Sequence, residues 1–231
     1  GTPQMGTPLA LLSMLYGYDE TMGLGALVTK KDARALAEYM PSAYALLPSE
    51  KYFSRIEEAF VTFDSERTRY QDFLETYGEK IQDHGEFRDF LLGTDGRADP
   101  TKDETELENV LTDSLLEAAT ATHERLDSWT PPANVELIQI AGWGLDTVSG
   151  VKYTEKEKTQ CFPSGKVMSC TGIGEYEPVY EPEFTVDGDK VGVTPSALML
   201  PEADNVKRYW VDLFDQNKGL KIDREHKDLF E

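Results

Sequence analysis

Several patterns that would point to a function are scarce in this sequence. Its apolar runs fall well short of the roughly 18 to 20 residues that a membrane-spanning helix needs, so no transmembrane segment is expected. Basic residues number 23 against 43 acidic ones, and the net charge of −20 argues against nucleic acid or an anionic membrane surface as a partner. With three histidines and two cysteines in 231 residues, neither a metal nor a cofactor is expected.

A nucleophile motif is also missing. No Gly-x-Ser-x-Gly occurs, although this sharp strand-to-helix turn exposes the serine of many hydrolases. Ser149 precedes Gly150 but has no glycine two residues before it. No signal-peptide pattern follows Gly1, and the Gly- and Pro-rich residues 1–8 are typical of a junction between elements. We therefore expect further sequence to precede this chain, and the targeting signal is undetermined.

The two cysteines flank a predicted hairpin. Cys161 and Cys170 lie on either side of a turn expected near residues 163–166. If the turn is centred between Gly165 and Lys166, the cysteines face each other and can form a disulfide, which would indicate an oxidising, extracytoplasmic compartment. Two free thiols on the hairpin face are the alternative. A zinc site is not expected, because no histidine lies nearby.

The first half of the chain has mainly helical patterns. Apolar residues at helical spacing predict helices over 8–16 and 31–39, and most clearly over 103–127. On the last of these the apolar face is formed by Leu107, Val110, Leu111, Leu115, Ala118, Thr122 and Leu126. His123 falls away from this face, and His84 lies among polar residues, so both are predicted to be solvated. Fewer than three strands are expected in this half.

Strand signals appear in the second half. Residues 135–141 form an apolar run that ends in Gly-Trp-Gly, which is typical of a largely buried strand of an α/β sheet. Residues 207–214 are the last strand candidate, and we expect the two segments to share one sheet. Residues 151–180 are predicted to form a β-hairpin insertion between them.

An acidic turn lies between the hairpin and the last strand. Phe184 to Val186 lead into Asp187-Gly188-Asp189, and Gly188 tolerates backbone angles that other residues avoid. A carboxylate on such a loop can orient a histidine that acts as a general base. The alternative is a solvated acidic turn. His226, beyond the last strand candidate, is the histidine in question, and its own alternative is an exposed residue at a frayed terminus.

The acidic turn and the His226 segment resemble lipase-like α/β-hydrolases related to the lecithin–cholesterol acyltransferases. Residues 184–198 are similar to the family's GDGTVP-type segment, in which the second Asp is the triad acid; here that residue is Asp189. Lys190 stands where the family usually has glycine. The segment Glu225-His226-Lys-Asp-Leu229 is similar to the EHxDLL-like segment that carries the triad histidine, which would be His226.

Two further segments resemble the same family. Residues 1–8, Gly-Thr-Pro-Gln-Met-Gly-Thr-Pro, are similar to its GTPxxGTP signature, found where the chain leaves the sheet for the lid. Residues 40–49, Met-Pro-Ser-Ala-Tyr-Ala-Leu-Leu-Pro-Ser, are similar to part of the lid, where they would line an acyl pocket; a place in the ordinary core is the alternative.

The resemblance implies the C-terminal part of an α/β-hydrolase fold, with a large helical lid and a β-hairpin insertion. The expected division is 1–8 as sheet-to-lid junction, 9–133 as lid, and 134–231 as late strands with the insertion 151–180. It further implies a serine-dependent lipase, esterase or acyltransferase acting on an acyl ester or lipid, with its serine upstream of Gly1. This chain alone should then be inactive. The alternative is a non-catalytic binding or interaction protein on the hydrolase scaffold, which Lys190 beside Asp189 favours.

Overall fold

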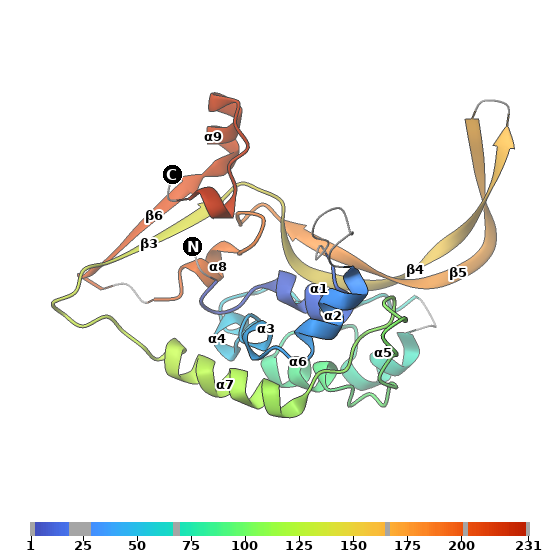
Figure 1. Ribbon diagram of the computed structural model, residues 1–231, viewed down its shortest axis with the longest axis horizontal. Helices are drawn as coiled ribbons and strands as arrows, with labels where there is room; N and C mark the ends of the chain where they lie inside the picture. The colour runs from blue at the N-terminus through green and yellow to red at the C-terminus, as the bar shows by residue number, and fades with distance from the viewer. Residues whose placement is uncertain (1–2, 19–28, 67–69, 165–166, 201–202, 230–231) are drawn as a thin grey trace.

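The protein has a mixed α/β fold. The computed structural model describes residues 3–18, 29–66, 70–164, 167–200 and 203–229. Figure 1 shows a group of helices beneath a long, curved two-stranded ribbon that extends to one side, while a second pair of strands lies at the opposite side near both chain ends. No helix in the described ranges is long and apolar enough to cross a bilayer.

The described helices lie mostly in the first half of the chain. They are α1 (Pro8–Tyr16), α2 (Lys30–Ala37), α3 (Pro41–Tyr44), α4 (Glu50–Phe53), α5 (Gln71–Tyr77), α6 (His84–Leu91), α7 (Asp113–Asp127), α8 (Thr194–Ala197), α9 (Leu213–Leu220) and a 3-10 turn (His226–Asp228). The strands are β1 (Val61–Phe63), β2 (Lys80–Ile81), β3 (Leu137–Trp143), β4 (Thr147–Ser164), β5 (Val167–Thr185) and β6 (Val206–Asp212).

These strands form two separate sheets. The larger has the order β2-β1-β4-β5, in which only β1 and β4 run parallel. The smaller is the parallel pair of β3 and β6, in register from Leu137 opposite Val206 to Trp143 opposite Asp212. The two strands predicted to share a sheet therefore do so. The last one ends at Asp212 rather than at 214, because α9 begins there with Asp212 as its N-cap.

The predicted helix over residues 8–16 is confirmed. Residues next to its two ends determine where it starts and stops. Pro8 occupies the first turn, where a missing N–H costs nothing. Gly17 ends the helix with φ of 63°, and a Cβ there would lie 2.3 Å from the carbonyl oxygen of Lys30. Leu11, Leu12 and Leu15 are fully buried against the core.

The helix predicted over 103–127 begins only at Asp113. Arg34, a residue only 3% exposed, donates hydrogen bonds to the carbonyl oxygens of Glu104 (3.1 Å) and Leu107 (2.9 Å). Those carbonyls would have to accept from the backbone four residues later in a helix. The N–H of Leu111 instead donates to the carbonyl of Leu91 at 2.9 Å. Groups distant in sequence therefore bond the backbone of this irregular segment in place of helical partners.

The face that α7 buries also differs from the prediction. Leu116, Ala119 and His123 are its buried residues, whereas Leu126 is 49% exposed. The prediction of a solvated His123 is wrong: the ring is 7% exposed, and Nε2 donates to the carbonyl oxygen of Ala45 at 3.0 Å. The apolar residues of this helix are spread around its circumference, so tertiary packing chose the face.

The predicted hairpin is longer than expected. It runs over 147–185 rather than 151–180, with Ser164 opposite Val167. The expected turn residues 165 and 166 lie outside the described residues. Cys161 pairs with Cys170 across the strands, and the two form a disulfide. β1 and β2, the two strands in the described part of 9–133, join the hairpin in one sheet.

The main core is aromatic and lies between the helices and this sheet. Phe63 of β1, Phe73 of α5, Phe90 of α6 and Tyr153 of β4 pack with ring centroids 5.3 to 6.1 Å apart. Aromatic pairs at these separations stabilise a core beyond the area that they bury. The smaller sheet is less well covered: Ile138, Tyr209 and Trp210 are each more than half exposed.

Candidate functional site

The acidic turn is fixed against the end of β3. The backbone N–H of Leu145 donates to the carbonyl of Gly188 at 3.1 Å, which places the turn beside the loop that follows β3. Thr147, fully buried, donates through Oγ1 to the carbonyl of Leu145 and accepts from the N–H of Lys190, both at 2.8 Å. A Cβ at position 188 would lie 2.5 Å from this hydroxyl, so the close approach requires glycine there.

The carboxylate of Asp189 is buried and held in one orientation. Asp189 is 2% exposed. Its Oδ1 accepts hydrogen bonds from the N–H groups of Gly192 (2.9 Å) and Val191 (3.3 Å). A buried carboxylate needs such donors, because it has lost the hydrogen bonds of water. Its second oxygen remains available for another partner.

That partner is His226. Its Nδ1 lies 2.8 Å from Asp189 Oδ2, and its backbone N–H donates to the carbonyl of Asp189 at 3.1 Å. The expected approach of the two side chains is thus observed, and Asp189 rather than the exposed Asp187 makes it. A carboxylate only accepts, so Nδ1 carries the proton. Nε2 has no hydrogen-bond partner within the described ranges, and the imidazole is 24% exposed.

Gly142, the sixth residue of β3, lets the acid and the C-terminal segment approach the strand. A Cβ at this position would lie 2.8 Å from Leu229 Cδ2, 2.9 Å from Leu213 Cδ1 and 3.0 Å from Asp189 Cβ. Three parts of the chain therefore pack on one backbone position that has no side chain. This glycine belongs to the Gly-Trp-Gly end of the predicted strand, but its contacts could not be read from the sequence.

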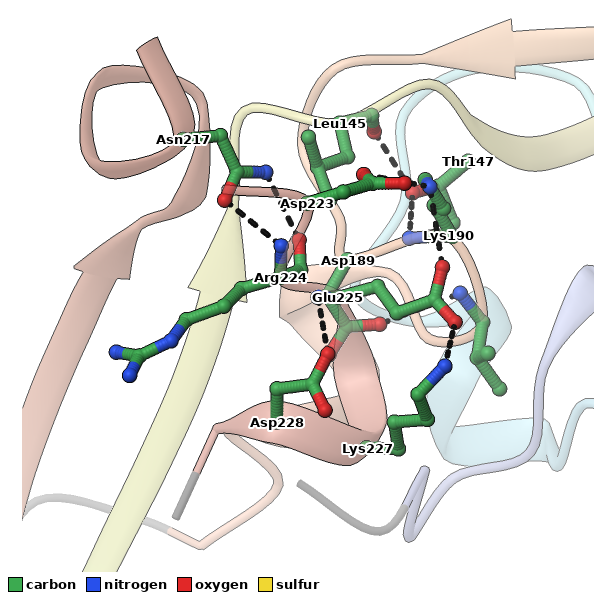
Figure 2. A network of polar contacts seen from close by, with 11 residues as sticks. Leu145, Thr147, Asp189, Lys190, Asn217, Asp223, Arg224, Glu225, Lys227 and Asp228 are labelled. Carbon is green, nitrogen blue, oxygen red and sulfur yellow. Dashed lines mark hydrogen bonds and ion pairs between the residues drawn. The ribbon is translucent and has the colours of Figure 1, made fainter. Parts of the chain in front are cut away.

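The segment that carries His226 is tethered by polar contacts (Figure 2). Asn217 of α9 brackets Arg224, donating to its carbonyl at 2.9 Å and accepting from its N–H at 2.8 Å. Asp228 accepts from the N–H of Glu225 at 3.0 Å and so closes the 3-10 turn. Lys190 reaches from the acidic turn to the Glu225 carboxylate, with Nζ 3.0 Å from Oε2.

The N-terminal segment joins the acidic turn to residues 40–49. Thr7 donates through Oγ1 to the carbonyl of Val191 at 2.5 Å, and its N–H donates to the carbonyl of Leu46 at 2.8 Å. Gly6, with φ of 85°, packs so closely that a Cβ would lie 2.2 Å from the carbonyl oxygen of Leu47. Residues 1 and 2 of the Gly-Thr-Pro repeat lie outside the described residues. The four segments singled out in the sequence thus form one connected region.

The described serines do not complete this pair. Ser196, beside the acidic turn, is fully buried and donates to the carbonyl of Gly6 at 2.6 Å while accepting from the N–H of Met5 at 3.1 Å. No hydroxyl in the part of the chain that the structure describes hydrogen-bonds to His226. The same part contains no group of three or more His, Cys, Asp or Glu residues arranged to hold a metal ion.

A separate cavity of about 330 Å³ lies between α3, α4, α6 and α7. Residues 44 and 47–49 line it together with charged side chains of α4, α6 and α7, whereas Asp189 and His226 do not. His84 and His123 do line it, and sequence patterns did not single out either as buried. His84 is half-buried rather than fully solvated, and this burial lowers its pKa. The cavity is therefore separate from the Asp189–His226 pair.

Comparison with known proteins adds no family. No protein-family model matches the chain, and no curated protein is significantly similar to it. The chemistry of the site therefore has to be argued from its geometry. An imidazole that is fixed at Nδ1 by a buried carboxylate, and whose Nε2 has no partner among the described residues, can accept a proton from a hydroxyl group or from water.

Proposed function

We propose that this chain supplies the acid and the histidine of a serine-dependent hydrolase or acyltransferase that acts on an acyl ester. The observation that carries the proposal is the Asp189–His226 pair. One carboxylate oxygen is held by backbone N–H groups and the other by Nδ1. The same arrangement orients the histidine of a Ser-His-Asp triad and sets its tautomer.

In the proposed mechanism, Nε2 of His226 takes the proton from a serine hydroxyl. The serine oxygen attacks the acyl carbonyl, and the tetrahedral intermediate collapses to an acyl-enzyme. The departing alkoxide takes the proton from Nε2. Water or a second alcohol then attacks the acyl-enzyme, again losing a proton to Nε2. The acyl–serine bond breaks, the acid or new ester leaves, and the serine oxygen takes the proton back from Nε2. Asp189 stabilises the imidazolium formed in each half of the cycle.

The serine and the oxyanion hole are proposed to lie on polypeptide upstream of Gly1. The exposed apolar residues of the β3–β6 pair support this, because parallel strands are normally covered on both faces. Ile138 and Tyr209 lie on one face of the pair and Trp210 on the other, so elements of that upstream polypeptide would cover both faces. The α/β-hydrolase assignment itself belongs to this proposal. An extracytoplasmic location does too, supported by the disulfide between Cys161 and Cys170.

The alternative, a non-catalytic binding protein on the same scaffold, was favoured by Lys190 beside the acid. The lysine side chain pairs with Asp223 and Glu225, so it leaves both the Asp189 carboxylate and His226 Nε2 unblocked. The upstream sequence discriminates between the two functions. A Gly-x-Ser-x-Gly after an apolar strand supports the enzyme, and the same turn without serine supports the binding protein.

Hydrolysis of short p-nitrophenyl esters tests the proposal. The chain joined to its upstream sequence should be active, and the chain alone should not. Asp189→Asn should lower kcat by about 10³- to 10⁴-fold, as loss of the orienting carboxylate does in serine triads, and His226→Ala should do at least as much. Asp187→Asn, an exposed carboxylate in the same turn, is the matched control and should change kcat by less than about twofold.

Full activity in Asp189→Asn would refute the triad, as would ester hydrolysis by the chain alone. A fluorophosphonate probe adds a second measurement, because it reacts only with an activated serine. It should label the longer polypeptide, and labelling should be lost in the His226→Ala variant.

A further inference from the structure

Lys190 adopts a backbone conformation that is unfavourable for a lysine. Its φ is 78°, in the left-handed region that glycine enters at much lower cost. Lys221, the other described non-glycine residue with positive φ, is the C-cap of α9, where this conformation is ordinary. Lys190 follows Asp189 directly and is not at a helix end. The contacts of the lysine side chain offset the cost of this backbone conformation.

The lysine side chain reaches across to the segment that carries His226. Its Nζ lies 3.0 Å from Glu225 Oε2 and 3.4 Å from Asp223 Oδ1 (Figure 2). Glu225 is the residue immediately before His226. The hydrogen bond to Glu225 raises the pKa of Lys190, and hydrogen bonds from Lys227 and then Lys190 lower the pKa of Glu225. Both groups therefore remain charged over the whole neutral range.

This contact differs in kind from the other ion pair of Glu225. Lys227 lies closer to the same carboxylate, 2.8 Å from Oε1, but it belongs to the same short segment. It cannot tie that segment to the acidic turn. Lys190 can, because its backbone is fixed by the hydrogen bond to Thr147 and by its neighbour Asp189. Its ion pairs thus act in parallel with the two hydrogen bonds between Asp189 and His226.

We propose that Lys190 is a positioning residue, whose ammonium group holds Glu225 and Asp223 so that His226 stays on Asp189. Its consequence for turnover rests on the proposed function, whereas its effect on the Asp189–His226 contact does not. The lysine, Glu225 and Asp223 side chains are 41%, 29% and 85% exposed, so salt will screen the attraction. The contact between acid and histidine should therefore weaken as ionic strength rises.

The test uses amide hydrogen exchange and NMR on the purified 231-residue chain. The N–H of His226 donates to the carbonyl of Asp189, so its exchange rate reports opening of this contact. Lys190→Met should speed this exchange about 1.5- to 5-fold at low salt, the range expected for exposed ion pairs. Added salt should speed exchange in the unmodified chain but not in Lys190→Met. In the NMR spectrum of Lys190→Met at low salt, the Nδ1–H signal of His226 should be broader than in the unmodified chain.

Two variants separate positioning from other effects. Lys227→Met removes a cation from the same carboxylate and should leave His226 exchange within about 1.3-fold of the unmodified rate, because it cuts no link to the turn. Lys190→Gly relieves the backbone strain but also removes the ammonium group. It should keep or raise the urea midpoint of the whole protein while speeding His226 exchange as Lys190→Met does.

Unchanged His226 exchange in Lys190→Met, or equal acceleration in Lys227→Met, would overturn the positioning role. In the longer, active polypeptide, Lys190→Met should lower kcat by a similar factor and leave KM unchanged. The two proposals can fail separately. Faster exchange together with an Asp189→Asn variant of full activity would keep the positioning role and reject the enzyme, and the converse pair of results would reject the positioning role alone.

Discussion

Replacing Gly142 with alanine tests the packing that brings the acid and the histidine together. The new methyl group would lie 2.8 Å from Leu229 Cδ2 and 2.9 Å from Leu213 Cδ1, where the leucine ends can rotate away. It would also lie 3.0 Å from the Cβ of Asp189, which cannot move without the acidic turn. The strain therefore falls on the contact between β3 and the Asp189–His226 pair.

The expected loss follows from two opposing terms. Inserting a methyl group into close-packed structure costs about 1 to 3 kcal/mol. Alanine in place of glycine restricts the unfolded chain and recovers about 0.5 to 1 kcal/mol. With each term taken near the middle of its range, Gly142→Ala should lower the free energy of unfolding by about 1 kcal/mol. Tm should fall by about 2 to 4 °C for each kcal/mol lost in a chain of this length.

Gly219→Ala is the matched control. Gly219 lies in the exposed part of α9, and a Cβ there would meet nothing within 4 Å. The same substitution should raise stability by up to about 1 kcal/mol, because alanine is the better helix former. Urea denaturation of both variants gives the free energies. Exchange at the His226 amide should accelerate in Gly142→Ala alone. Equal or greater stability in Gly142→Ala would refute the close packing described for β3.

Two other predictions concern buried titratable groups. Burial raises the pKa of Glu108, which accepts a hydrogen bond from Tyr16, so the folded state favours its protonated form and stability falls as pH rises above about 4.5. Glu108→Gln keeps an acceptor without the charge; its urea midpoint should exceed that of the unmodified protein at pH 7, and a lower midpoint would contradict the argument. Burial lowers the pKa of His84, so its contribution is complete above pH 6.5 and is lost as pH falls through the lowered pKa. His84→Gln should flatten the loss of stability as pH falls below 6.5, and an unchanged slope would show that other groups cause it.

Local chemistry made some elements predictable and left others open. The helix over 8–16 could be predicted because Pro8 and Gly17 act on the backbone next to them. The start of α7 could not, since the backbone before it bonds to Arg34 and to the carbonyl of Leu91, which are distant in the sequence. His123 was misplaced for a related reason. Its helix has apolar residues on several faces, and only the packing of neighbouring helices selects one of them.

The sequence by itself determined the chemical groups of the candidate site. Asp189 follows a glycine that a tight turn needs, and His226 lies in a short polar segment near the last strand, so both residues could be singled out. Their contact was a matter of tertiary structure. The parallel pairing of β3 and β6 and the space left at Gly142 bring together residues 37 positions apart. The role of Lys190 was decided in the same way, because the charge of its side chain is a property of the sequence, but which carboxylates it meets depends on where the fold places Glu225 and Asp223.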